Sequence, residues 1–107
     1  MAPGAFYLFG GSGYASAKRP NQSFSAGIAS AAGGVGLRNA AGTLVDSVGY
    51  GTATNTLVET RPAPAPPTTA APGSSDIRLP DGVDTNDNGA DLTATATPTP
   101  GAPNAAG

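Results

Sequence analysis

The sequence predicts an all-β protein, and three observations support this class. No stretch of the 107 residues repeats its apolar side chains with the 3.6-residue period of an amphipathic helix. Residues 35–50 instead alternate large and small side chains on both sides of a turn, which is typical of a β-hairpin. The 16 glycines and 11 prolines divide the rest of the chain into short segments. We therefore expect short strands joined by turns and long loops.

The N-terminal part predicts one short strand and a long loop. Residues 4–14 join an apolar run, Phe6–Phe9, to Gly10-Gly11-Ser12-Gly13, which indicates a strand followed by a tight turn. Residues 15–34 are small and polar, so we expect a loop there with at most a short strand around Phe24. No signal peptide is predicted, because the apolar run is short, broken by glycine and not preceded by basic residues.

The clearest element is the hairpin. Val35–Arg38 is its first strand, and residues 39–42 are its turn, since Asn39 and Gly42 tolerate positive φ. Period-two alternation on the returning strand divides the side chains between two faces. One face carries Leu44, Asp46, Val48 and Tyr50, and the other carries Val45, Ser47 and Gly49.

The C-terminal half begins with a Pro-rich loop over residues 61–75, because proline lacks the N–H that a sheet requires. Its P-x-x-P spacing, Pro64 to Pro67, also occurs in SH3 ligands, but it is common in any Pro-rich stretch, so we favour a plain loop. Ile77–Leu79 and Leu92–Ala96 are short strand candidates. Residues 97–107 predict a flexible C-terminal tail.

Composition excludes several classes of protein. Leu, Val, Ile and Phe make up about 15% of the chain, below the roughly 20% with which a core is usually built. The absence of Cys and His excludes disulfides, thiolate or imidazole metal sites and His-dependent catalytic triads. The apolar run at residues 5–9 is far short of the ~20 residues that span a bilayer. A net charge of −2 with five basic residues argues against a nucleic-acid groove.

Catalytic patterns are absent from the sequence. Ser12 has neither the G-x-S-x-G spacing nor a histidine to activate it. Lys18 lacks the preceding glycine of a phosphate-binding loop. Asp46 and Glu59 could form a carboxylate pair, but nothing in the sequence brings them together. We therefore predict that the protein is not an enzyme.

Four of the seven acidic residues lie within the acidic loop, residues 81–91. Read as an EF-hand loop, it places Asp84, Asn86 and Asn88 at the first, third and fifth ligand positions, but Thr95 stands where the bidentate Glu belongs. Asp and Asn side chains also cap nearby backbone N–H groups in Asx turns, and we favour this interpretation. The alternative is a Ca²⁺ site made of Asp84, Asn86, Asn88 and Asp91.

Taken in order, these segments resemble the lamin tail domain of bacterial proteins. Residues 34–51 are similar to its strand, glycine-containing turn and vvDsVgYG motif. Residues 78–92 resemble R-x-x-D-G-x-D-T-x-x-N-x-x-D-F, with Leu92 in place of Phe, and residues 98–104 resemble P-T-P-G-x-x-N. The family's opening strands, with their I-x-E and F-V-E-L-x-N segments, have no counterpart before Phe6.

The resemblance implies an incomplete immunoglobulin-like β-sandwich with long Gly/Pro-rich loops, formed by residues 4–96. A sandwich without its first strands would have an unpaired edge and an open core face, so we hypothesise that Met1 is an internal start. On this hypothesis half a core is present in the chain. Its expected members are Phe6, Leu8, Val35, Leu37, Leu44, Val48, Tyr50, Leu79 and Leu92.

The resemblance also implies a function: a non-catalytic interaction module, extracellular or at the cell surface, with no cofactor. Its partner would be an unknown protein, a component of the cell envelope or an enzyme to which the module is an accessory. One alternative is a Ca²⁺-binding adhesion or cell-wall module that uses the acidic loop. Another is a mostly disordered spacer rich in Ala, Pro and Thr.

Overall fold

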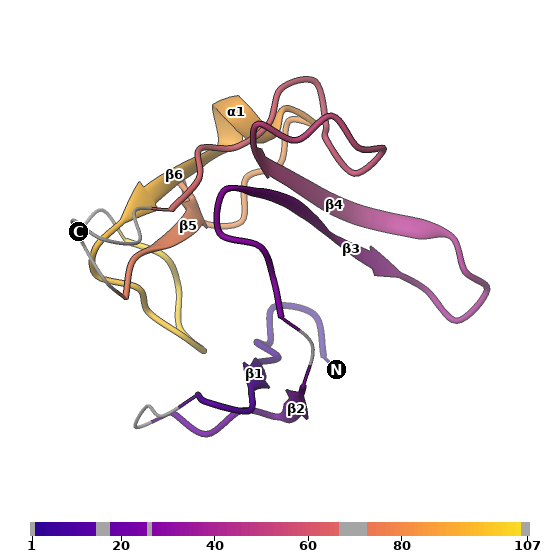
Figure 1. The fold of residues 1–107 in the computed structure, drawn as a ribbon. Helices are drawn as coiled ribbons and strands as arrows, with labels where there is room; N and C mark the ends of the chain where they lie inside the picture. Colours follow the sequence, from indigo (N-terminus) through magenta and orange to yellow (C-terminus); the bar gives the residue numbers. More distant parts are fainter. Residues whose placement is uncertain (1, 15–17, 26, 67–72, 106–107) are drawn as a thin grey trace.

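The computed structural model describes residues 2–14, 18–25, 27–66 and 73–105, and most of its regular structure is β-strand. The strands form three two-stranded sheets (Figure 1). β1 and β2 pair in parallel, whereas β3 with β4 and β5 with β6 are antiparallel. The predicted β-rich class is confirmed. The elements are β1 Phe9–Gly11, β2 Gln22–Phe24, β3 Ala32–Arg38, β4 Leu44–Gly51, β5 Ser75–Arg78, α1 Asn88–Asp91 and β6 Leu92–Thr95.

The first strand lies later in the chain than predicted. Residues 6–8 are outside β1. The Leu8 N–H donates to Asn21 Oδ1 at 2.8 Å, and the Leu8 carbonyl accepts from the N–H groups of Asn21 at 2.7 Å and Gln22 at 3.2 Å. Gly10 and Gly11, expected in the turn, belong to the strand. A side chain at Gly10 would lie 2.8 Å from Pro20 Cβ, so the close approach requires glycine. The short strand expected around Phe24 is confirmed as β2.

The predicted hairpin is confirmed as β3 and β4, but β3 begins at Ala32, within the range 15–34 where a loop is expected. Its turn is stabilised by Asn39, whose Oδ1 accepts from the N–H groups of Ala41 and Thr43, both at 3.0 Å. The register shifts between Leu37 and Arg38. The shift places the Leu44 side chain beside Gly36, on the opposite face from Asp46, so the prediction that these two residues share a face is wrong.

One face of this hairpin is covered by the loop that follows β4. Leu57 packs at Gly34 and Gly36, and Val58 packs at Gly49. A Cβ atom at Gly49 would lie only 2.9 Å from Val58 Cα. The glycines on this face therefore allow the backbone of the loop to approach the sheet closely.

The other face is open. Val35 pairs with Val48, and Gly33 pairs with Tyr50, so Val35, Val48 and Tyr50 share this face. Tyr50 is buried and its hydroxyl donates to the Ala29 carbonyl, but Val35 and Leu37 are 52% and 56% exposed. Among the described residues the buried apolar ones are Tyr50, Ala63 and Ile77. The expectation of a core is wrong for Phe6, Val35, Leu37 and Leu44, which are all exposed.

The start of the predicted Pro-rich loop lies against β4. Ala63, flanked by two prolines, keeps its own N–H and donates it to the Gly49 carbonyl at 2.7 Å, while its carbonyl accepts from Gly51 N at 2.8 Å. Ala63 thereby forms a parallel bridge with Tyr50. β5 begins at Ser75, inside the range 61–75, and residues 67–72 of the predicted loop lie outside the described residues.

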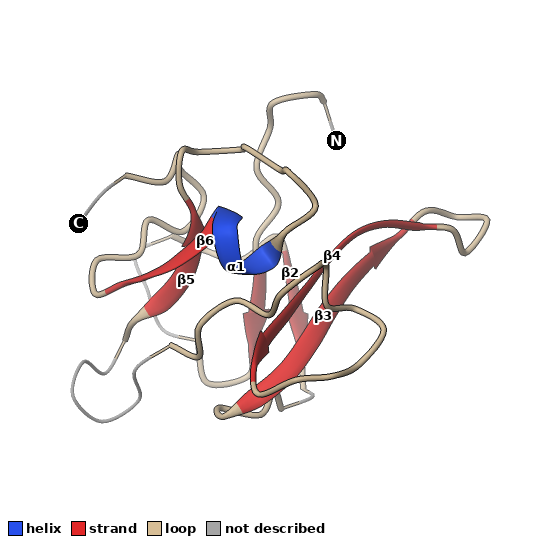
Figure 2. Ribbon diagram, turned by 90° about the horizontal axis from the view of Figure 1, so that it is seen from above, coloured by secondary structure: helices blue, strands red, loops and turns tan. Residues whose placement is uncertain are grey.

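β5 and β6 confirm the two later strand candidates, although β5 ends at Arg78 and leaves out Leu79. α1 is the last part of the acidic loop and is followed directly by β6 (Figure 2). The described part of the predicted tail, 97–105, folds back onto this region. Asn104 donates its backbone N–H to Asp81 Oδ1 at 2.8 Å and its side-chain amide to the Arg78 carbonyl at 3.1 Å. In the described parts of the chain, no helix has the length and apolar character needed to cross a membrane.

Candidate functional site

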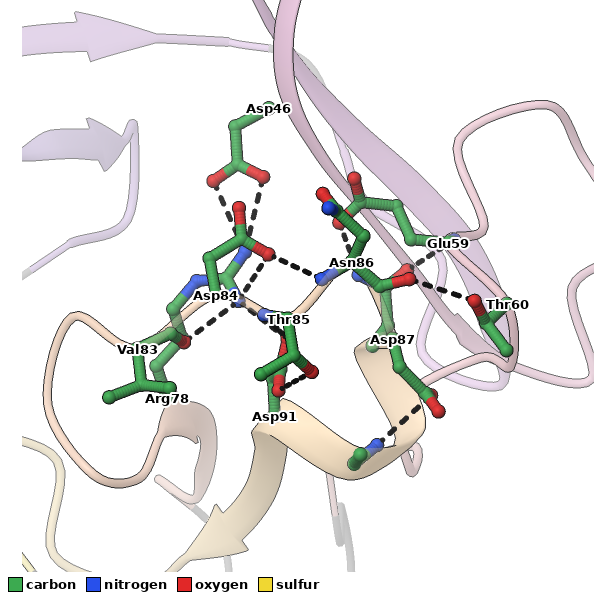
Figure 3. A network of polar contacts seen from close by, with 12 residues as sticks. Asp46, Glu59, Thr60, Arg78, Val83, Asp84, Thr85, Asn86, Asp87 and Asp91 are labelled. Carbon is green, nitrogen blue, oxygen red and sulfur yellow. Dashed lines mark hydrogen bonds and ion pairs between the residues drawn. The ribbon is translucent and has the colours of Figure 1, made fainter.

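Arg78 on β5 is the centre of an acidic cluster. Its Nη2 atom lies 3.1 Å from both carboxylate oxygens of Asp46 on β4, and its Nη1 atom lies 3.5 Å from Asp84 Oδ1 and from Asp91 Oδ2 (Figure 3). The Arg78 side chain is only 15% exposed. We call Asp46, Arg78, Asp84 and Asp91 the Arg78 cluster. It joins the β3–β4 hairpin to β5 and to the acidic loop.

Glu59 lies beside this cluster. One carboxylate oxygen each of Asp46, Glu59 and Asp84 lies within 4.8 Å of the others. The pKa of Glu59 is raised, first by burial and then by the charges of Asp84 and Asp46. Nothing in the sequence predicted that Asp46 and Glu59 would meet, but the structure brings them together. Arg78 contacts two of these three carboxylates, Asp46 and Asp84, and its positive charge acts to lower the pKa of the third, Glu59.

Two of the four predicted calcium ligands, Asp84 and Asp91, meet at Arg78, but Asn88 is bonded elsewhere. Asn88 is completely buried, and its side chain turns toward β4 and Glu59. Its Oδ1 atom accepts from Gly49 N at 2.9 Å and from Glu59 N at 2.8 Å, which occupies both lone pairs. Its Nδ2 group donates to the Ser47 carbonyl and to Glu59 Oε1, both at 3.1 Å. Asn88 could therefore ligate a cation only by breaking buried hydrogen bonds.

The other predicted ligands are engaged in turns. Asp84 Oδ1 accepts from Asn86 N at 3.0 Å, which is the Asx turn that the sequence favoured. Both oxygens of Asp91 accept from Thr85, from its N–H and its hydroxyl, at 2.6 Å each. These bonds, followed by the charge of Arg78, lower the pKa of Asp91. The calcium site stays a prediction, and local hydrogen bonds use most of its expected ligands.

Asp87 caps α1. Its Oδ1 atom accepts from Ala90 N at 3.2 Å, and its Oδ2 atom accepts from Nη2 and Nε of Arg61 at 3.0 and 3.2 Å. The bond from Arg61 is the main cause of the lowered pKa of Asp87. Because Arg61 begins the segment that docks on β4, this pair holds the acidic loop against the rest of the fold.

A second feature is an apolar groove between the open face of the hairpin and the β5–β6 pair. Its volume is about 370 Å³. The lining residues are Ile28, Ala29, Ser30, Val35, Val48, Tyr50, Pro66, Asp76 and Leu92. Asp76 and Arg78 share one face of β5 by alternation, and Leu92 pairs with Arg78. The groove is therefore apolar except at Asp76 and a few small polar groups.

Asp76 is the unusual member of this lining. Its Oδ1 atom is buried and has no hydrogen-bond partner. Burial raises the pKa of Asp76 to about 6, because no donor or cation compensates the loss of water around the carboxylate. No sequence pattern provides a functional reason to single out Asp76. The alternation of Asp76, Ile77 and Arg78 on a short strand is the signal that puts Asp76 on the Arg78 side.

Replacing Asp76 with asparagine is expected to stabilise the protein at pH 8 by about 1 kcal/mol. This is less than the full pKa shift would give, because water partly screens the half-buried carboxylate. The pKa is raised on folding from 3.8 to about 6, so Asp76 stabilises the folded state most below pH 3.8, and this contribution is lost as the pH rises through 6. The gain should therefore vanish at pH 4. Urea unfolding at both pH values measures it, with the exposed Asp81→Asn as control; an equal gain at pH 4 and 8 would contradict the assignment.

The fold and the two sites define a β-rich protein with a buried polar cluster and an open apolar groove. No family model, curated protein or solved structure matches this chain.

Proposed function

We propose that the protein is a non-catalytic interaction module that binds a protein partner through the open apolar face of its β3–β4 hairpin. The observation that carries this proposal is the exposure of Val35 and Leu37 on β3 and of neighbouring Ile28, at 52%, 56% and 60%. Apolar side chains gathered on one face of a sheet are the usual mark of a surface that another molecule covers.

The strand edge supports the same proposal. Within the described residues β3 pairs with β4 alone, so its outer edge has unpaired backbone groups next to the exposed side chains. Such an edge can accept an added strand from a partner, and the neighbouring side chains then give specificity. The Arg78 cluster supports a structural rather than a catalytic role, because its carboxylates face an arginine and local N–H groups. The lamin-tail resemblance of residues 34–51 and 78–92 supports a module of this kind, outside the cell or at its surface.

Binding of a neutral apolar dye such as Nile red tests the proposal. The double variant Val35→Ser, Leu37→Ser is expected to reduce dye binding about tenfold, because each substitution removes an apolar contact on the face. The matched control is Val45→Ser, Val83→Ser, two exposed apolar residues outside the groove lining, which should leave binding unchanged. Unfolding curves check that both variants remain folded. Equal dye binding by both double variants would contradict the proposed face.

A further inference from the structure

The groove on this face contains a mismatch that points to a specific partner. Its walls are aliphatic and aromatic, from Val35, Val48, Tyr50 and Leu92, yet one carboxylate oxygen of Asp76 is buried in its surroundings without a donor. The buried acid of the Arg78 cluster differs in this respect, since both oxygens of Asp91 accept hydrogen bonds from Thr85. A buried acceptor without a partner lowers stability unless something satisfies it.

We propose that this groove binds an apolar segment of a partner protein that places one lysine or arginine side chain against Asp76. The inference rests on the proposed function, and it names the chemistry of the partner at the same face. Charge complementarity selects a cation: a positive group in the groove would place an opposite charge beside the Asp76 carboxylate, in surroundings with few polar atoms. An anionic segment would instead add a second charge of the same sign beside Asp76.

None of the protein's five basic residues, all of which the structure describes, is hydrogen-bonded to Asp76 Oδ1. Arg78, the nearest basic residue on β5, is directed to Asp46, Asp84 and Asp91, and Arg61 is bonded to Asp87. The raised pKa of Asp76, caused by burial alone, is consistent with a carboxylate that has no cation near it. The lysine or arginine must therefore come from the bound molecule.

Three peptides of equal length test the inference: acetyl-Leu-Lys-Leu amide, the same peptide with norleucine for Lys, and the same peptide with Glu. Binding to the full ¹⁵N-labelled chain is followed by NMR shifts at Val35, Val48, Asp76 and Leu92 at pH 7.5. The Lys peptide is expected to bind about fivefold to tenfold more tightly than the norleucine peptide, and the Glu peptide more weakly than both.

The matched variant is Asp76→Asn, which keeps the size of the side chain and is expected to fold at least as well. It should reduce the preference for Lys over norleucine to about one. Val35→Ser should weaken both peptides equally. A preference for Lys that survives Asp76→Asn would overturn the cation-binding role.

The remaining outcomes separate this inference from the proposed function. If Nile red binds the face but no peptide shifts the groove residues, the inference is wrong and the open apolar face stands. If neither dye nor peptide binds there, both are wrong. Concentration-dependent self-association that covers Val35 and Asp76, measured by light scattering and NMR, would overturn the inference in favour of a second copy of the chain as the occupant.

Discussion

Replacing Asn88 with alanine is expected to destabilise the protein by about 4 kcal/mol. This is a large fraction of the free energy of unfolding of a small domain. The Asn88 side chain makes four hydrogen bonds inside the protein, and its removal leaves the N–H groups of Gly49 and Glu59 and the carbonyl of Ser47 without partners. Gly49 and Ser47 are buried, so water cannot replace the lost bonds without opening the structure. Urea unfolding followed by circular dichroism measures the loss.

Asn86→Gly is the matched control, because it removes an exposed amide two residues away at a position whose φ of 59° suits glycine. Its stability should change by about 0.5 kcal/mol or less. If Asn88→Ala does not fold at all, amide exchange in the unmodified protein still tests the network. The N–H groups of Gly49 and Glu59 should then exchange slowly; exchange as fast as that of Ala41, in the exposed turn, would contradict the role of Asn88.

The local elements could be predicted from the sequence to a good extent. The β3–β4 hairpin depends on alternation and on Asn39 and Gly42 in the turn, which are properties of neighbouring residues. The start of β1 could not be predicted in this way. Asn21 bonds to Leu8 from 13 residues away, and the strand begins only at Phe9, the last residue of the apolar run.

The site depends even more on distant contacts. Asn88 looked like a cation ligand because its spacing from Asp84 and Asn86 matches an EF-hand, and spacing cannot show that its amide is used by Gly49, 39 residues earlier. Asp46, Glu59 and Asp84 are likewise far apart in the chain and meet only when β4, its following loop and the acidic loop pack together. Val35 is exposed because no segment among the described residues packs over it. A local sequence pattern cannot predict whether a distant segment will cover a residue.

Replacing Arg78 with methionine is expected to lower stability by about 3 kcal/mol at pH 7, because it leaves Asp46, Asp84 and Asp91 without their cation. Arg78→Lys should lose roughly half as much, since an ammonium group cannot keep the two bonds to Asp46 and also reach the Val83 carbonyl. Urea unfolding of the unmodified protein, Arg78→Lys and Arg78→Met measures their order of stability. A methionine variant as stable as the unmodified protein would show that the cluster contributes nothing to the fold.

The pH dependence of the same variant has a definite sign. The lowered pKa of Asp91 gives stability that is present above the ordinary pKa of an aspartate and is lost as the pH falls through the lowered value; Arg78 contributes to that lowering. In Arg78→Met this contribution shrinks, and the pKa of Glu59, which Arg78 holds down, rises further. The difference in stability between the two proteins should therefore be greatest near pH 7 and should decrease as the pH falls below 3.8, through the lowered pKa of Asp91.

Calcium then distinguishes the two interpretations of the acidic residues. If Arg78 takes the place of a cation, millimolar Ca²⁺ should raise the melting temperature of Arg78→Met by several degrees, because three carboxylates within 4.8 Å of one another, including Asp46 and Glu59, then lack a counter-charge. The unmodified protein should show little change, since its arginine already lies among them. A larger effect of Ca²⁺ on the unmodified protein than on the variant would favour the calcium-binding alternative over an arginine-centred cluster.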